Sequence, residues 1–204
     1  MVSKTRDKLI EVARQLFAHK GIENTTMNDI AAASDKGRRT IYTYFKNKRD
    51  IFNAVIERES EQLISRLRVI KEADMPPVEK LTDYLRVRFD FLMEAVPRHD
   101  GLLQILGRDF RKMDRIRRLA LVKEMDMFKN VIAEGVETGE FDPAQAARLP
   151  YVESMVFQGI DYCNLRGFFQ EHDISVTAIR DDVIRFMIKG LLIAPAPNNL
   201  ETTN

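Results

Sequence analysis

The chain has 204 residues, of which 45% are hydrophobic and 31% charged, and its formal net charge is only +1. This composition supports a real core, in one large domain or in a small domain joined to a medium one. The single cysteine, Cys163, excludes an internal disulfide framework and fits a reducing compartment. No apolar run approaches the roughly 18 residues that span a bilayer, and the charged N-terminus lacks a signal-peptide core. We therefore expect a cytoplasmic protein with no membrane partner.

Three short helices are predicted at the N-terminus. Apolar residues recur at helical spacing over about residues 4–20. Thr26, with Asp29 three positions later, forms a capping box that begins a second helix. The turn at residues 34–37 then leads to a third short helix over about residues 38–45.

A long fourth helix is expected to connect this small domain to a larger one. Asn47 is its predicted cap, again with an acid, Asp50, three residues later. The helical pattern continues to Ala73, and the pair Pro76 and Pro77 lies just beyond it. Because proline disrupts a helix interior, the connection should end there.

The remaining chain is also predicted to be helical, with no convincing strand. The expected fold is all-α, with a three-helix domain over residues 1–47 and a larger helical domain over residues 48–194, in which residues 48–73 are the connecting helix. Residues 195–204 lack periodicity and are predicted to be a disordered tail. Further helices are expected from about 78 to 97, 102 to 113, 116 to 136, 150 to 163 and 176 to 194, with a loop at 167–173.

The charge is unevenly distributed along the chain. Residues 1–50 contain 11 basic and 6 acidic residues, a net charge of +5, whereas residues 51–204 carry a net charge of −4. A basic head on a mildly acidic body indicates that the head alone meets a polyanion.

The third predicted helix has a basic and aromatic surface. On a helical wheel Ile41 and Phe45 define the buried side, so Arg39 and Thr43 point outward. No acid occurs from position 36 to position 48. The predicted DNA contacts are the outward and shoulder positions of this helix together with residues at the flanking helix caps: Thr26, Arg38, Arg39, Thr40, Tyr42, Thr43, Tyr44, Lys46 and Lys48.

These residue types suit the major groove of DNA. Arginine bonds guanine bidentately and threonine offers a methyl or hydroxyl group to base edges, while tyrosine hydroxyls and lysines suit phosphates. The N-termini of the second and fourth helices are further candidate phosphate sites. The alternative is an ordinary solvated basic helix, which does not explain two tyrosines on exposed shoulders.

Two segments carry a family resemblance, TMNDIA (residues 26–31) and TIYTYFKNK (residues 40–48), with Phe52 beyond them. Over roughly residues 5–56 the chain resembles the N-terminal signature of TetR-family transcriptional regulators. The resemblance implies an all-α homodimer whose second and third helices form a helix-turn-helix for half of a palindromic operator. It also implies a bacterial repressor released by a small molecule. The turn departs from the family pattern with Asp35 and Lys36, and Arg39 stands where a small residue is common.

The last two helices are predicted to form the dimer. From Phe186 onward the final helix is apolar on more than one side, which burial against a second subunit explains, and the resemblance places the dimer there too. A monomer with a fully buried last helix is the alternative. The candidate interface residues are Val152, Met155, Gly159, Val183, Phe186, Met187, Gly190 and Leu191.

We expect an apolar effector pocket in the larger domain, mainly because the family resemblance implies one. Methionine and phenylalanine suit adaptable apolar pockets, although such stripes also form plain cores. The candidate lining residues for a small apolar or amphipathic effector are Phe89, Met93, Phe110, Met113, Met125, Phe128, Met155 and Tyr162.

No catalytic or metal-binding pattern is apparent. His19, His99 and His172 are far apart, and no HExxH, GxSxG, glycine-rich phosphate loop or Cys/His spacing occurs. We expect no enzyme activity, no cofactor and no metal. Two alternatives stay open: a DNA-binding regulator that responds to no ligand, and an all-α enzyme or small-molecule carrier whose basic head is incidental.

Overall fold

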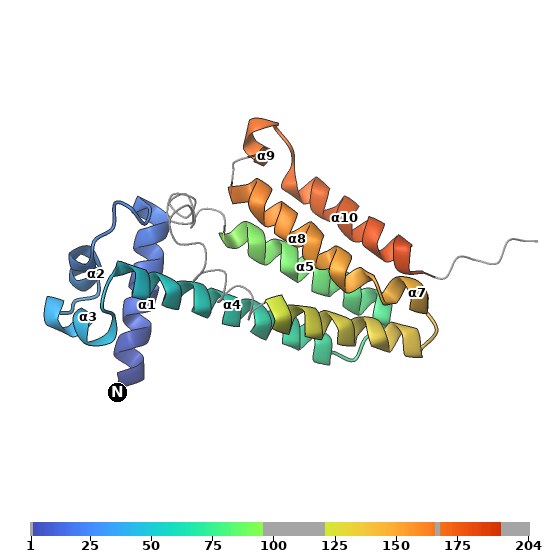
Figure 1. The fold of residues 1–204 in the computed structure, drawn as a ribbon, viewed down its shortest axis with the longest axis horizontal. Coiled ribbons are helices and arrows are strands. Elements are labelled where there is room, and N and C mark those ends of the chain that lie inside the picture. Colours follow the sequence, from blue (N-terminus) through green and yellow to red (C-terminus); the bar gives the residue numbers. More distant parts are fainter. Residues whose placement is uncertain (1, 96–120, 166–167, 193–204) are drawn as a thin grey trace, which may run out of the picture.

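The structure is a computed structural model that describes residues 2–95, 121–165 and 168–192 (Figure 1). These residues are almost entirely helical, as the sequence predicted. The expected helix at 102–113 and the tail at 195–204 lie outside the described residues.

A small three-helix head forms the N-terminal domain. It contains α1 (Val2–Lys20), α2 (Met27–Ala33) and α3 (Arg38–Tyr44). The predicted capping box begins α2, since the Thr26 hydroxyl accepts from the Asp29 amide and the Asp29 carboxylate accepts from the Thr26 amide. The head core includes Leu9, Ile10, Ala13, Phe17, Ile30, Ile41, Phe45 and Phe52.

The turn between α2 and α3 depends on one left-handed residue. Asp35 has φ of 56°, a conformation that aspartate tolerates better than most side chains. The amide of Lys36 donates to the carbonyl of Ala31 at 3.0 Å and closes the turn. The aspartate therefore supplies the geometry that a glycine gives many helix-turn-helix motifs.

Helix α4 (Lys48–Glu72) belongs to both domains. Its first turns bury Ile51, Phe52 and Val55 in the head core, and Leu63 and Leu67 belong to a second core in the body. Asn47 caps it as predicted, with its side chain accepting from the Asp50 amide. The helix thus connects the domains without a flexible linker.

The body is a bundle of helices around the second core. It contains α5 (Pro77–Ala95), the helix over residues 121–137, α7 (Pro143–Ala146), α8 (Leu149–Leu165), α9 (Phe168–Glu171) and α10 (Val176–Leu191). Figure 1 shows α5, α8 and α10 running side by side, with α4 and the 121–137 helix below them. Aromatic pairs fill the centre, including Phe89 with Phe157 at 4.7 Å and Tyr84 with Phe128 at 5.3 Å between ring centroids.

Two predictions about the body need correction. The expected loop at 167–173 contains the short helix α9, because the buried ring of Phe169 anchors a turn there. The last helix ends at Leu191 and does not continue to residue 194. Leu192 instead forms an isolated antiparallel bridge with Phe141, and the Asp142 amide donates to the Leu191 carbonyl at 2.8 Å.

Candidate nucleic-acid interface

Helix α3 presents its predicted outer face to solvent. Ile41 and Phe45 are buried in the head core, whereas Arg39, Tyr42 and Thr43 are exposed. The Thr43 hydroxyl donates to the Arg39 carbonyl at 3.0 Å. Its hydroxyl proton is therefore used within the helix, which leaves its methyl group and oxygen lone pairs for a base edge.

The two shoulders of α3 differ more than the helical wheel suggested. Tyr42 is 42% exposed, and the guanidinium of Arg38 lies 5.7 Å from its ring centroid. Tyr44 is half-buried and packs against the head core. Thr40 is also half-buried, while Lys46 is exposed. The accessible surface of α3 thus combines the cations of Arg38 and Arg39 with the aromatic ring of Tyr42.

The flanking caps use some of the amides that were predicted to hold phosphates. The Asp29 amide donates to Thr26 Oγ1 at 3.1 Å, and the Asp50 amide donates to Asn47 Oδ1 at 3.0 Å. Hydrogen bonds from the Thr26 amide and hydroxyl lower the pKa of Asp29, so this carboxylate stays charged at the cap. At each of the two helix N-termini, one backbone amide is therefore already bonded within the protein and is not free to bind a phosphate.

Lys48 has a structural role that the sequence did not reveal. Its Nζ donates to the carbonyl oxygens of Ile22 at 2.7 Å and Glu23 at 3.1 Å. These bonds tie the start of α4 to the loop between α1 and α2. A phosphate contact by Lys48, which stays a prediction, would share the same ammonium group.

The candidate dimer residues divide into two groups. Phe186 and Met155 are 84% and 65% exposed, and Val152, Gly159 and Gly190 are also exposed, while Val183 is half-buried. Met187 and Leu191 are instead buried in the core of their own protomer. Their role in a subunit interface stays a prediction, and the exposed members of the set are better placed to contact a second subunit.

The candidate pocket residues that the structure describes lie in different surroundings. Phe89 and Phe128 are wholly buried and pack against neighbouring rings, and Met125 is half-buried. Met155 lies on the exposed side of α8, which fits its predicted dimer role better than its predicted pocket role. Phe110 and Met113 lie outside the described residues, as do the side chains of Met93 and Tyr162.

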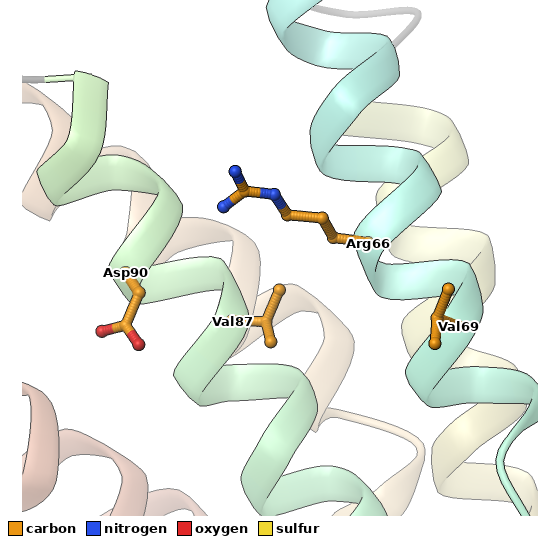
Figure 2. A pocket seen from close by; sticks show the side chains of 4 residues that line it. All are labelled: Arg66, Val69, Val87 and Asp90. Atoms are coloured by element: carbon orange, nitrogen blue, oxygen red, sulfur yellow. The ribbon is translucent and has the colours of Figure 1, made fainter.

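An open groove of about 320 Å³ instead lies between α4 and α5. Figure 2 shows Arg66 reaching from α4 toward α5, where Val87 and Asp90 stand, with Val69 farther along α4. The guanidinium of Arg66 lies 5.4 Å from the ring centroid of Phe91. The groove combines apolar walls with one cation and one anion.

A buried polar cluster inside the body was also not predicted. Arg88 forms an ion pair with Glu124, and both side chains are almost completely buried. The Tyr84 hydroxyl donates to the Glu124 carbonyl at 3.0 Å, and Glu153 is buried nearby. Burial raises the pKa of Tyr84, and the negative charges of both glutamates add to this effect.

The described residues contain no group of three or more His, Cys, Asp or Glu side chains placed to hold a metal ion. Within the same residues, no helix has the length and apolar character needed to cross a membrane.

Comparison with known proteins identifies the family. The sequence model of bacterial regulatory proteins of the tetR family matches residues 9–55, which cover most of the head. An HTH-type transcriptional regulator of Staphylococcus aureus (strain MRSA252) is 30% identical over 132 residues, which are 62% of this chain and 69% of that protein. The chain belongs to the TetR family. The relatives that it matches are transcriptional regulators.

Other similar proteins match this chain in part of their sequence or in their fold. The probable acrEF/envCD operon repressor of Escherichia coli (strain K12) is 31% identical over 122 residues, 59% of this chain. The match spans only 55% of the length of that repressor. Solved structures resemble this chain over nearly its whole fold. The structure of a putative transcriptional regulator from Saccharomonospora viridis in complex with choline has a TM-score of 0.77 at 20% identity, and the match covers 94% of this chain and 99% of the other. FadR from Bacillus subtilis in complex with stearoyl-CoA has a TM-score of 0.65 at 20% identity, covering 90% and 97%.

Proposed function

We propose that this TetR-family protein is a sequence-specific DNA-binding transcriptional repressor. The observation that carries the proposal is the outer face of α3, where Arg38, Arg39 and Tyr42 stand exposed in a segment without acids. A capped helix on either side holds that face rigidly on the head core. Arg39 is the proposed base-reading residue, and Tyr42 and Lys46 are the proposed phosphate contacts.

The repressor is proposed to act as a homodimer on a palindromic operator. Exposed Phe186 on α10 and exposed Met155 on α8 give the two helices an apolar outer face. Large exposed apolar side chains are unfavourable on a monomer and are typical of a subunit interface. A two-fold dimer presents two copies of α3 to half-sites about one DNA turn apart, 34–36 Å.

Two glycines offer a direct test of this dimer. A Cβ added at Gly159 or Gly190 would meet nothing within 4 Å in the protomer. An arginine at either site therefore fits the isolated protomer but would bury a charge if a second subunit packs there. Gly159→Arg and Gly190→Arg should sediment as folded monomers and bind the operator weakly. A folded Gly159→Arg protein that is still dimeric and still binds DNA would place the interface elsewhere.

The body is proposed to bind a small apolar or amphipathic effector. Two proteins of similar fold were solved with choline and with stearoyl-CoA, which both carry a charged group and an apolar part. The groove between α4 and α5 has matching chemistry, with Val69 and Val87 beside the cation of Arg66, while the carboxylate of Asp90 is paired with Arg180. Because α4 continues into the head, a ligand that favours another position of α4 would change the spacing of the two copies of α3. The ligand can reduce DNA affinity by no more than the difference between its own affinities for the DNA-binding position of α4 and for the other position.

Selection from a random-sequence duplex library tests the proposed function. The full chain should enrich a palindromic sequence with half-sites one turn apart. If the protein is a regulator that responds to no ligand, the same sequence should be enriched and no apolar ligand should change DNA binding. The all-α enzyme or carrier predicts no enriched sequence, and that result would reject the proposal.

A further inference from the structure

Arg6 occupies an unusual position on α1. The buried stripe of this helix runs through Leu9, Ile10 and Ala13, and Arg6 continues the same stripe toward the N-terminus at helical spacing. An apolar residue would be expected on this stripe, yet Arg6 is an exposed cation. Its guanidinium lies 5.6 Å from the ring centroid of Phe45.

Arg6 is the fifth residue of α1 and lies beyond its first turn, where the effect of the helix dipole has faded. The place of its charge on the buried stripe therefore needs a reason outside its own helix, and a residue that breaks a local pattern points to a functional role.

Phe45 places Arg6 beside the recognition helix. Phe45 is the C-cap residue of α3, so the guanidinium that covers its ring stands next to the C-terminal end of α3. Figure 1 shows the first turns of α1 near α3 in the head. A guanidinium stacked on a ring keeps the N–H donors on its edge free for a phosphate. Asp7, the next residue, projects about 100° around the helix from Arg6.

The width of the major groove indicates that a backbone phosphate is the group that Arg6 would meet. The groove is about 12 Å wide, and a helix with its side chains is roughly 10–12 Å across. With α3 in the groove, groups beside the helix meet the phosphate strands that border it. We propose that Arg6 is a DNA contact that clamps a backbone phosphate next to the end of α3. The inference rests on the proposed DNA-binding function.

A salt titration with a matched control tests the contact. Lys4 lies one half-turn away, carries the same charge and is also exposed, but it projects about 200° around the helix from Arg6. The probe is the duplex selected from a random library, bound by the full chain, Arg6→Gln, Arg6→Lys or Lys4→Gln. In a dimer, Arg6→Gln should make the slope of log affinity against log salt less steep by about 2 and weaken binding on the order of 10- to 100-fold at 0.1 M salt.

The other variants separate a phosphate contact from a structural effect. Arg6→Lys should keep most of the slope, and Lys4→Gln should change it by less than half as much as Arg6→Gln. An unchanged slope for folded Arg6→Gln, or equal losses for Arg6→Gln and Lys4→Gln, would overturn the inference alone. If the wild-type protein selects no duplex, the proposed function and this inference both fail.

Discussion

Replacement of Gly135 by alanine sets helix propensity against packing. Gly135 lies in the helix over residues 121–137, where alanine is normally the better residue by about 1 kcal/mol. A Cβ at this position would stand 2.8 Å from Cγ of Phe141 and still closer to Cδ2 and Cε2 of the same ring. Phe141 is wholly buried, and its amide donates to the Gly135 carbonyl at 3.0 Å, so the ring has little freedom to move away.

The packing cost should exceed the propensity gain. Overpacking a buried site costs about 1–3 kcal/mol and sometimes more, and three ring carbons inside 3 Å place this site at the upper end. After the gain of about 1 kcal/mol is subtracted, Gly135→Ala should destabilise the protein by about 2 kcal/mol. For a chain of this length that corresponds to a melting temperature lower by roughly 4–8 °C.

Thermal unfolding followed by circular dichroism measures the effect. The control is the same substitution in a Phe141→Ala background, where the clash is gone and Gly135→Ala should be neutral or stabilising. A melting temperature that rises on Gly135→Ala in the wild-type background would refute the packing argument.

Three further predictions concern the body core, the head and the connecting helix. Glu124→Gln should destabilise the fold by about 3–5 kcal/mol in chemical denaturation, because it removes the charge of one member of a buried ion pair. Hydrogen bonding to Arg14 lowers the pKa of Glu11 below its ordinary value of 4.5. The ionised Glu11 carboxylate therefore stabilises the fold above pH 4.5, and this stabilisation is lost as the pH falls through the lowered pKa. The melting-temperature difference between wild type and Glu11→Gln should accordingly shrink from pH 6 to pH 3. Two glycines inserted after Ser60 should leave both domains folded but weaken operator binding and abolish any effector response in a gel-shift assay, and a mutant that binds and responds as the wild type would exclude α4 as the transmitter.

Local signals made the head predictable from the sequence. The caps at Thr26 and Asn47 depend on residues three positions apart, and the turn expected at residues 34–37 depends on a short run of residues. The outward direction of Arg39 and Thr43 follows from the period of a single helix. Each of these features is local, and the structure confirms them.

Contacts between distant residues were not predictable in the same way. The bonds of Lys48 to the carbonyls of Ile22 and Glu23, and the stacking of Arg6 on Phe45, join parts of the chain that only the folded head brings together. No local pattern marks them, because neither pair shares a helix.

The body shows a second limit of sequence patterns. A helical wheel shows that α10 has two apolar sides, but it does not tell which side faces the core of its own protomer. The structure assigns Met187 and Leu191 to that core and leaves Phe186 outside. The α9 turn was missed because Phe168 and Phe169 are too short a run to show a period.

The most direct test of the central claim is the binding of Arg39→Ala across an operator library. If α3 reads the major groove, the variant should lose about 1–3 kcal/mol on the best sequence and relax base preference at one position in each half-site. Tyr42→Phe, measured on the same library, should weaken all sequences by a similar factor if its hydroxyl holds a phosphate. An Arg39→Ala protein that binds every sequence with the same relative preference as the wild type would contradict base readout by the outer face of α3.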